Sequence, residues 1–219
     1  MKNYDYIFAS CPLFDGIALS DLSAMMTCIG GKTVSTDKEQ YIFREGDAAT
    51  HVGLVLTGAV RMEREDYYGN RSIVAHIGPG QLFGENYACA GVAALPISVV
   101  ADEASNVLLM DCRRITRSCS HACEFHSRII FNLLQLVAVK NLVYDQKIQV
   151  TSKRTTREKL MTYLLNQAKI NDSNTFQIPY DRQELADYLE VDRSGLSAEI
   201  SKLRREQILE CEKNRFTLL

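Results

Sequence analysis

Apolar and polar residues alternate in short runs from about Lys32 to Asp111. Gly, Pro, Asn and Asp residues separate these runs at regular intervals, a spacing that is typical of a β-sandwich or barrel. The pattern therefore predicts a β-roll, preceded by a short helix that Ser20 caps and that Gly30 and Gly31 end. We expect strands at residues 34–36, 40–43, 51–56, 59–64, 71–77, 97–101 and 106–111.

The period of the pattern changes after the last strand. No Gly or Pro occurs from Glu124 to Thr151, and seam residues recur at alternating spacings of four and three, as in a coiled coil. The pattern predicts a helix about 40 Å long. A second apolar side, with Ile129 and Leu133, suits packing against the β-roll. The predicted dimer seam contains Ile130, Leu134, Val137, Asn141, Tyr144 and Ile148.

Asn141 bears on whether this helix pairs with a second copy. One buried asparagine per helix can bond its symmetry mate and fix the register, whereas in the apolar core of a monomer it would lack a partner. The asparagine therefore favours a homodimer, and the alternative is a single buried helix in a monomer.

The seam stops at residues 152–154, and a hinge is expected near residues 152–155. Thr155, with Glu158 three residues later, forms a capping box that starts a new helix. We therefore expect a β-roll domain with flanking short helices (1–123), a long helix (124–152) and a carboxy-terminal domain (153–219).

The segment DRQELADYLEVDRSGLSAEISKLRREQIL (181–209) carries the most specific pattern in the chain. Asp181 and Glu184 form a second capping box, and Asp192 can cap another helix after a tight turn. Two short helices and a tight turn predict a helix-turn-helix, whose second helix enters the major groove of DNA. The alternative is a helical hairpin used for protein contact.

The second helix of this motif has polar and basic side chains on its predicted outer face. A guanidinium can bond guanine O6 and N7, hydroxyl groups suit bases or phosphates, and a lysine neutralises phosphates. Glu210 to Leu219 resemble a two-stranded wing with Lys213 and Arg215 at its turn. The outer face contains Arg193, Ser194, Ser197, Ser201 and Lys202.

Composition excludes several classes of protein. No run of about 18 apolar residues occurs, and the first ten residues do not read as a secretory signal, so we expect a cytoplasmic protein without a membrane span. Seven cysteines without a CxxC pair argue against a disulfide framework or zinc ribbon. A net charge of −2 does not by itself indicate a nucleic-acid binder.

An enzyme is the less favoured class. A metal-dependent cupin needs a pair of histidines one residue apart, whereas His51 and His76 are isolated, and no nucleophile elbow, P-loop or GxGxxG stretch occurs. We therefore expect no catalytic residues, cofactor or resident metal.

The segments FREGDAATHVGLVLTGAVRM, IGPGQLFGE and DRQELADYLEVDRSGLS resemble, in order and spacing, the family of the cyclic-AMP receptor protein and the fumarate and nitrate reduction regulator (CRP/FNR). The resemblance implies an α+β fold: a cyclic-nucleotide-binding-like β-roll (jelly roll), a long dimerisation helix and a winged helix-turn-helix. It also implies a homodimeric bacterial transcription regulator that contacts RNA polymerase. Such a dimer reads a near-palindromic operator in double-stranded DNA, with half-sites about 34 Å apart.

Several DNA contacts follow from this resemblance. Arg193 matches the arginine that reads a guanine, and Arg182 and Gln183 match phosphate contacts. Ala198 stands where the cyclic-AMP receptor protein has a second base-reading arginine, so a different operator is expected.

The sensor part departs from the family's cyclic-nucleotide branch. Gly84 and Glu85 match its ribose-binding pair, but Leu95 and Pro96 replace the arginine and serine that hold the phosphate. Leucine has no charge and proline has no amide hydrogen, so cyclic AMP is not the expected effector. Either Glu85 only caps its turn, or an unidentified small molecule binds there. The expected effector residues are Gly84, Glu85, Arg71, Tyr144 and Asp145, and His76 also suits the cavity.

A redox- or metal-responsive regulator of the same family is the alternative. The iron-sulfur branch has a tight amino-terminal cysteine cluster, whereas this chain has only Cys11 and Cys28 there, so a cluster is not expected. A redox link between Cys11 and Cys211 has no geometric support from the sequence. A second group, of cysteines and histidines, has a spacing at which two side chains could bind one metal ion. Because no other residue of the sequence completes such a site, we interpret this group as incidental. This group is Cys119, His121, Cys123 and His126.

Overall fold

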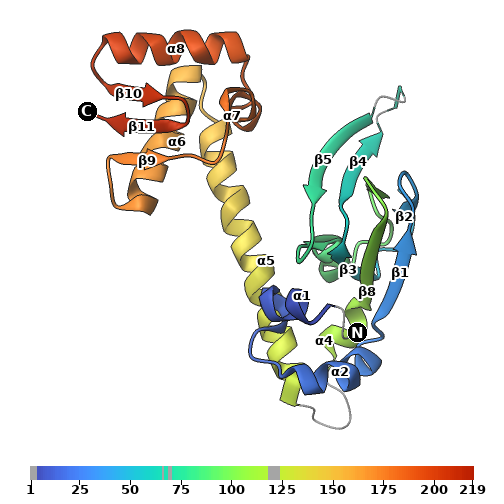
Figure 1. Ribbon diagram of the computed structural model, residues 1–219. Coiled ribbons are helices and arrows are strands. Elements are labelled where there is room, and N and C mark those ends of the chain that lie inside the picture. Colours follow the sequence, from blue (N-terminus) through green and yellow to red (C-terminus); the bar gives the residue numbers. More distant parts are fainter. Residues whose placement is uncertain (1–3, 66, 69–70, 118–123) are drawn as a thin grey trace. The chain divides into compact units, whose positions relative to one another are not determined.

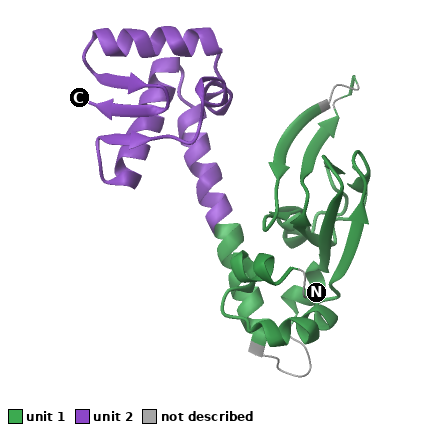
Figure 2. Ribbon diagram, viewed as in Figure 1, with its two compact units in different colours: residues 1–138 green, residues 139–219 purple. Residues whose placement is uncertain are grey.

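The computed structural model of the chain describes residues 4–65, 67–68, 71–117 and 124–219. The chain divides into two compact units, residues 1–138 and 139–219, coloured separately in Figure 2. The division falls inside helix α5 (Glu124–Thr151). Ile129 and Leu133 in its first half pack in the core of the first unit, whereas Val150 in its last turn packs in the core of the second. The three-part division expected above stays a prediction.

The first unit contains two four-stranded antiparallel sheets (Figure 1). The predicted β-roll is confirmed, since each of the seven expected strands occurs with ends within two residues of the prediction. The strand order of one sheet is β1 (Lys32–Thr36), β8 (Ser105–Asp111), β3 (His51–Thr57) and β6 (Leu82–Phe83). The order of the other is β2 (Tyr41–Phe43), β7 (Ser98–Ala101), β4 (Val60–Glu65) and β5 (Arg71–Ile77).

Strand β3 is buried on both faces. Side chains alternate along a strand, so Leu54 and Leu56 belong to the cluster shared with the helices, while Val55 belongs to the cluster shared with the second sheet. Gly53 lies beside the ring of Phe83, and a Cβ atom at this position would come within 2.1 Å of that ring. Glycine is therefore required here for the packing of β6 on β3.

Short helices flank the sheets of the first unit. The helix expected from Ser20 is present, but its start differs from the prediction: Ser20 lies in a 3₁₀ turn, and no side chain caps α2. Its end at Gly30, where φ is 68°, is as expected. The strand pattern of the sequence did not predict the short helix after Gly84. The helices are α1 (Asp5–Ser10), η2 (Pro12–Phe14), η3 (Leu19–Asp21), α2 (Leu22–Cys28), α3 (Glu85–Ala90) and α4 (Cys112–Thr116).

The second unit packs three helices and the end of α5 against a small sheet. The predicted capping box is confirmed: Glu158 N donates to Thr155 Oγ1 at 3.1 Å, and Thr155 N donates to Glu158 Oε2 at 3.2 Å. In the described part of the chain, no helix is both long and apolar enough to cross a membrane. The elements are α6 (Thr156–Asn171), β9 (Thr175–Gln177), α7 (Arg182–Leu189), α8 (Arg193–Arg205), β10 (Leu209–Glu212) and β11 (Arg215–Leu218).

Candidate DNA-binding surface and sensor site

The two helices of the carboxy-terminal motif begin where their sequence caps predict. Asp181 Oδ1 accepts from Glu184 N at 2.8 Å and Glu184 Oε2 accepts from Asp181 N at 2.7 Å, which starts α7. Glu190, with φ of 54°, ends α7, and Asp192 Oδ2 accepts from Gly195 N at 2.9 Å to start α8. A hydrogen bond from Ser194 holds the pKa of Asp192 below its usual value, so the cap is a carboxylate.

The inner face of the motif is apolar and closely packed. Ala186 of α7 and Leu196 of α8 are fully buried, together with Leu203 in the last turn of α8. A small residue at position 186 allows the two helices to pack closely. The geometry is that of a helix-turn-helix with α8 as its second helix.

The outer face of α8 contains the residues expected from the sequence, all of them exposed. None of the residues that the structure describes forms a hydrogen bond or ion pair with Arg193, so its guanidinium keeps its donors. The hydroxyl groups of Ser194 and Ser201 are engaged, because the first donates to Asp192 and the second donates to Ser197 O at 2.9 Å. The hydroxyl protons of these two serines are therefore used within the motif, and their contacts with DNA stay a prediction.

Ion pairs within the second unit leave a positive balance on the exposed side of α8. Arg157 of α6 pairs with Glu206 Oε2 at 2.6 Å and with Glu199 Oε1 at 3.7 Å. Glu199 of α8 and Glu206, which follows the helix, are paired with Arg157 in this way, and no ion pair among the described residues involves Arg193 or Lys202. Such a face suits a polyanion.

The wing, formed by β10 and β11, is tied to the start of α7 by Arg182. Its Nη2 atom lies 3.3 Å from Cys211 Sγ and 3.4 Å from Lys213 O, and its guanidinium lies over the ring of Phe216. Lys213 has φ of 52° at the tip of the wing, and both Lys213 and Arg215 are exposed. Arg182 thus connects α7 to the wing, and its predicted phosphate contact stays a prediction. Gln183 bonds Asp187 on the exposed side of α7.

Two basic residues that the sequence analysis did not single out extend this surface. Arg204 and Arg205, in the last turn of α8, line a groove of about 1230 Å³ together with Arg215 of the wing. Glu210 and Glu212 line the same groove. The run KLRR at 202–205 is the sequence feature that would have indicated these arginines.

The sensor turn of the first unit has the geometry that its glycines predict. Gly84 has φ of 75° and is followed by Glu85, the first residue of α3, which is only 3% exposed. A side chain at position 84 would meet His51 O at 3.3 Å. The backbone therefore requires glycine here, and the side chain of Glu85 is buried.

The positions that would hold a phosphate do not form a cradle for an anion. Leu95 is 4% exposed, and its backbone N donates to Asp47 O at 2.8 Å, while its carbonyl accepts from Gly46 N at 2.9 Å. Its side chain belongs to the apolar interior, and Pro96 has no amide hydrogen. The two positions thus offer neither a charge nor a free donor.

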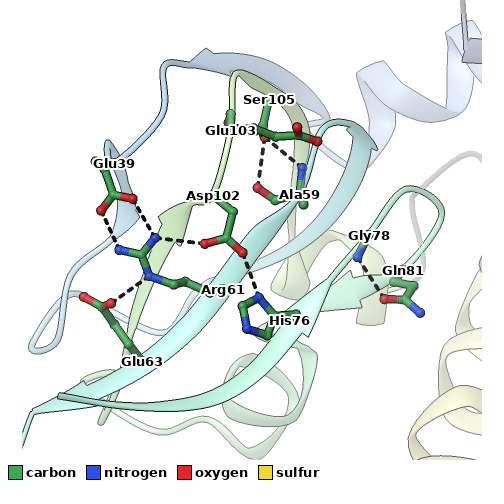
Figure 3. A network of polar contacts seen from close by, with 10 residues as sticks. All are labelled: Glu39, Ala59, Arg61, Glu63, His76, Gly78, Gln81, Asp102, Glu103 and Ser105. Atoms are coloured by element: carbon green, nitrogen blue, oxygen red, sulfur yellow. Dashed lines mark hydrogen bonds and ion pairs between the residues drawn. The ribbon is translucent and has the colours of Figure 1, made fainter. Parts of the chain in front are cut away.

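A network of polar contacts centred on Arg61 of β4 connects strands and turns of the second sheet (Figure 3). Its guanidinium donates to Glu39 at 3.0 and 2.7 Å, to Asp102 at 2.9 Å and to Glu63 at 3.0 Å. His76 Nδ1 lies 2.8 Å from Asp102 Oδ2. His76, a cavity candidate in the sequence, therefore belongs to this network, which joins β4, β5 and two turns.

The charges of this network set the protonation of its carboxylates. Partial burial alone would raise the pKa of Asp102, but hydrogen bonds from Arg61 and His76 outweigh it and hold that pKa below its usual value. The hydrogen bond from Arg61 likewise lowers the pKa of Glu39, and the carboxylates raise the pKa of Arg61. Glu39, Asp102 and Arg61 are therefore ionised at neutral pH.

The remaining sensor candidates lie in separate parts of the chain. Tyr144 is exposed, and Asp145 Oδ2 accepts from Gln149 Nε2 at 3.0 Å. Both belong to the second unit, so their relation to Glu85 stays a prediction. Arg71 begins β5 and pairs with Glu65 in the ladder, and its side chain lies outside the description.

Part of the cysteine and histidine group near the start of α5 is described. Cys119, His121 and Cys123 lie outside the described residues. His126 is buried, with Nε2 at 2.8 Å from Arg114 O and Nδ1 at 3.6 Å from Cys28 Sγ. The described stretches contain no group of three or more potential metal ligands.

Two family profiles match the chain in the order in which these sites occur. The cyclic nucleotide-binding domain matches residues 33–121, which contain the sheets, and the Crp-like helix-turn-helix domain matches residues 158–219. The chain is also similar to the transcriptional activator protein FnrA of Stutzerimonas stutzeri, with 22% identity over 83% of this chain and 74% of that protein. The chain belongs to the CRP/FNR family.

The chain is also similar to another curated protein and to solved structures with the same fold. The transcriptional activator protein FnrL of Cereibacter sphaeroides is 24% identical over 82% of this chain and 73% of its own length. The catabolite activator protein of Thermus thermophilus has the same fold, with a TM-score of 0.56 and 23% identity over 95% of this chain and 93% of that one. DNR from Pseudomonas aeruginosa has a TM-score of 0.52 and 17% identity over 100% and 95% of the two chains. The protein is thus a transcription regulator with a DNA-binding helix-turn-helix, not an enzyme.

Proposed function

We propose that the chain acts as a cytoplasmic homodimer that binds a near-palindromic operator and is controlled by a small molecule other than cyclic AMP. The observation that carries the proposal is the capped helix α8, whose exposed side has basic groups without acidic partners on the helix. RNA polymerase is the proposed protein partner at the promoter.

We assign the role of base reader to Arg193. It is exposed at the first turn of α8, the part of a recognition helix that reaches base edges. Lys202, Gln183, Lys213 and Arg215 are proposed phosphate contacts, since they are exposed polar or basic groups around α8 and the wing. Arg182, Ser194, Ser197 and Ser201 also stay proposed DNA contacts, and the hydrogen bond from Arg182 to Lys213 O also positions the wing.

The operator can be found by selection from random DNA, followed by footprinting and titration of single-base variants. Arg193→Ala should lose about 1–3 kcal/mol of binding at one base pair per half-site. Lys202→Ala should weaken binding to every sequence and reduce the slope of log affinity against log salt by about 1. Lys38→Ala is the matched control, because it removes an exposed lysine of the first unit.

Two results would contradict this assignment. An equal loss on all sequences for Arg193→Ala would make Arg193 a phosphate contact. Failure of the wild-type chain to retain any selected DNA, with turnover of some substrate, would remove the regulator proposal.

The dimer proposal rests on the exposed apolar side chains of α5. Leu134 is 65% exposed, Ile148 63% and Tyr144 57% in the single chain, which is unusual for large apolar groups on a helix. Ile130 and Val137 are half-buried and Asn141 is exposed. Phe131 and Leu142 are exposed as well, so the proposed interface is wider than the predicted seam.

A charged substitution on the seam tests the dimer. Leu134→Asp should shift sedimentation equilibrium toward the monomer and weaken operator binding, since a carboxylate would be buried between two helices. Val139→Asp is the matched control, because Val139 is also exposed but lies about 140° around the helix from Leu134. An unchanged dimer in Leu134→Asp would show that this seam is not the interface, and a wild-type chain that sediments as a monomer would contradict the dimer proposal.

The effector proposal combines a buried Glu85 with the absence of an anion cradle at Leu95 and Pro96. We propose that Gly84, Glu85 and Arg71, with Tyr144 and Asp145 of α5, recognise a small polar or aromatic molecule. Titration calorimetry should show no micromolar binding of cyclic AMP. Micromolar binding of cyclic AMP would contradict the proposal. A thermal-shift screen of other small molecules should identify the effector, and Glu85→Gln should abolish the shift that this effector causes.

We propose that the effector acts by shifting populations of two dimer states, because a ligand changes an equilibrium only by its different affinity for the two states. The segment between α5 and α6, residues 152–155, is the proposed hinge. Asn141→Leu should raise dimer stability and weaken the effector response. An unchanged response would show that the seam is not the switch.

A further inference from the structure

Two cysteines from separate parts of the first unit lie in contact. Cys89 is in the last turn of α3, Cys112 is the first residue of α4, and their sulfur atoms are 3.6 Å apart in a hydrogen bond. Cys89 is exposed, whereas Cys112 is buried. The pair thus combines one thiol that solvent can reach with one that it cannot.

Ordinary core packing does not account for this arrangement. A buried free cysteine behaves as a small apolar group, which describes Cys11: it is buried in the core, and burial raises the pKa of its thiol. Cys89 is exposed, so it contributes little to the core, and its sulfur is nevertheless directed at Cys112.

We propose that Cys89 and Cys112 form a thiol oxidation site that reacts with a hydroperoxide and closes into a disulfide within the chain. In the first step the sulfur of Cys89 attacks the peroxide, the O–O bond breaks, and Cys89 becomes a sulfenic acid while the peroxide leaves as an alcohol or water. In the second step the sulfur of Cys112 attacks that of Cys89, the S–O bond breaks, and water leaves. The peroxide takes up both electrons.

The order of the two residues follows from access. A peroxide in solution reaches the exposed Cys89, while the buried Cys112 meets only its neighbour. The hydrogen bond from the Cys89 thiol, opposed by burial and by Asp111, holds the pKa of Cys112 below its usual value. This favours the thiolate that the second step needs.

The raised pKa of Cys89 makes the first step slow. The pKa of Cys89 is raised, chiefly because its proton is held in the bond to Cys112, then by burial and by the charge of Glu85. Fewer thiolates mean slower attack on the peroxide. Excess peroxide is therefore required in the test, whereas closure of the disulfide should be fast.

Closing the bond requires a small movement. The sulfur atoms must approach from 3.6 Å to about 2.05 Å, which rotation of two side chains can supply. The disulfide would link α3 to α4, and α3 begins at Glu85. Oxidation would thus fix the helix that follows the sensor turn.

The full-length reduced chain is treated with excess hydrogen peroxide, alkylated and mapped by mass spectrometry. We expect a peptide that joins Cys89 to Cys112, about 2 Da lighter than the two reduced peptides together because two hydrogens are lost. Dithiothreitol should restore both thiols. Cys89→Ser should abolish the linked peptide and leave Cys112 alkylatable after unfolding, whereas the control Cys211→Ser should keep the link.

The intermediate gives an independent readout. In Cys112→Ser the sulfenic acid of Cys89 has no resolving thiol, so a sulfenic-acid trap should label Cys89 more strongly than in the wild type. If Cys112→Ser does not fold, Cys89→Ser decides the question alone. Overoxidation of Cys89 to sulfinic or sulfonic acid without a linked peptide, or a link from Cys112 to another cysteine, would overturn the proposal.

Discussion

Replacing Arg61 by methionine should destabilise the first unit more than the loss of a surface ion pair would. Methionine keeps most of the side-chain volume but removes all four hydrogen bonds of the guanidinium. The side chain of Arg61 is only 12% exposed and that of Glu63 only 8%, so the pair at 3.0 Å is largely out of solvent. After the substitution, the carboxylate of Glu63 stays buried without this partner.

The contributions of the carboxylates differ with their exposure. Removing one partner of a buried pair costs about 3–5 kcal/mol, whereas an exposed pair contributes at most about 1 kcal/mol. Glu39 is 57% exposed, so its pair adds little, and Asp102 keeps its contact with His76. We therefore expect the free energy of unfolding of the first unit to fall by about 3–5 kcal/mol, mostly through Glu63.

Urea unfolding of the full chain, followed by circular dichroism, measures this change, and hydrogen exchange assigns the transition to β4 and β7. The double variant Arg61→Met with Glu63→Leu should recover much of the loss, because the uncompensated carboxylate is gone. Arg61→Lys, which keeps the charge but loses the forked geometry, should lie between wild type and Arg61→Met. A loss below about 1 kcal/mol for Arg61→Met, or no recovery in the double variant, would refute the reasoning.

Three further outcomes are expected. The pKa values of Glu39 and Asp102 are lowered in the folded state, so both groups stabilise it above their unfolded pKa values of about 4.3 and 3.9. This stability is lost as pH falls through the lower folded pKa values. A pH series of urea melts should show the loss, and the free energy of unfolding should depend less steeply on pH in Arg61→Met. Asp192→Ala leaves Gly195 N without its cap and should cost the second unit about 1 kcal/mol, measured by its thermal transition; Asp187→Ala, away from the caps, is the control. Leu95→Arg with Pro96→Ser should lower the thermal midpoint of the first unit without conferring micromolar binding of cyclic AMP in calorimetry, because position 95 points into the core; tight binding would show that the side chain reaches the pocket.

Local sequence rules predicted the starts of the carboxy-terminal helices well. The pairs Thr155 with Glu158 and Asp181 with Glu184 bond within four residues of each other, so their contacts hardly depend on the rest of the fold. Ser20 failed as a cap because the chain forms a 3₁₀ turn there and α2 begins after it. Thr155 and Asp181 cap their helices from an extended backbone conformation, whereas the residue before α2 is already helical.

The sequence alone determined the strands, the long helix, the helix-turn-helix and the absence of an arginine and serine at Leu95 and Pro96, because alternation, caps and composition are local properties. Tertiary structure decided which distant side chains meet. Arg61 gathers carboxylates from two turns and its own strand, and Cys89 meets Cys112 across 22 intervening residues, because the strand order brings their elements together. No local pattern encodes that order, since it depends on how the two sheets and their helices bury apolar area together.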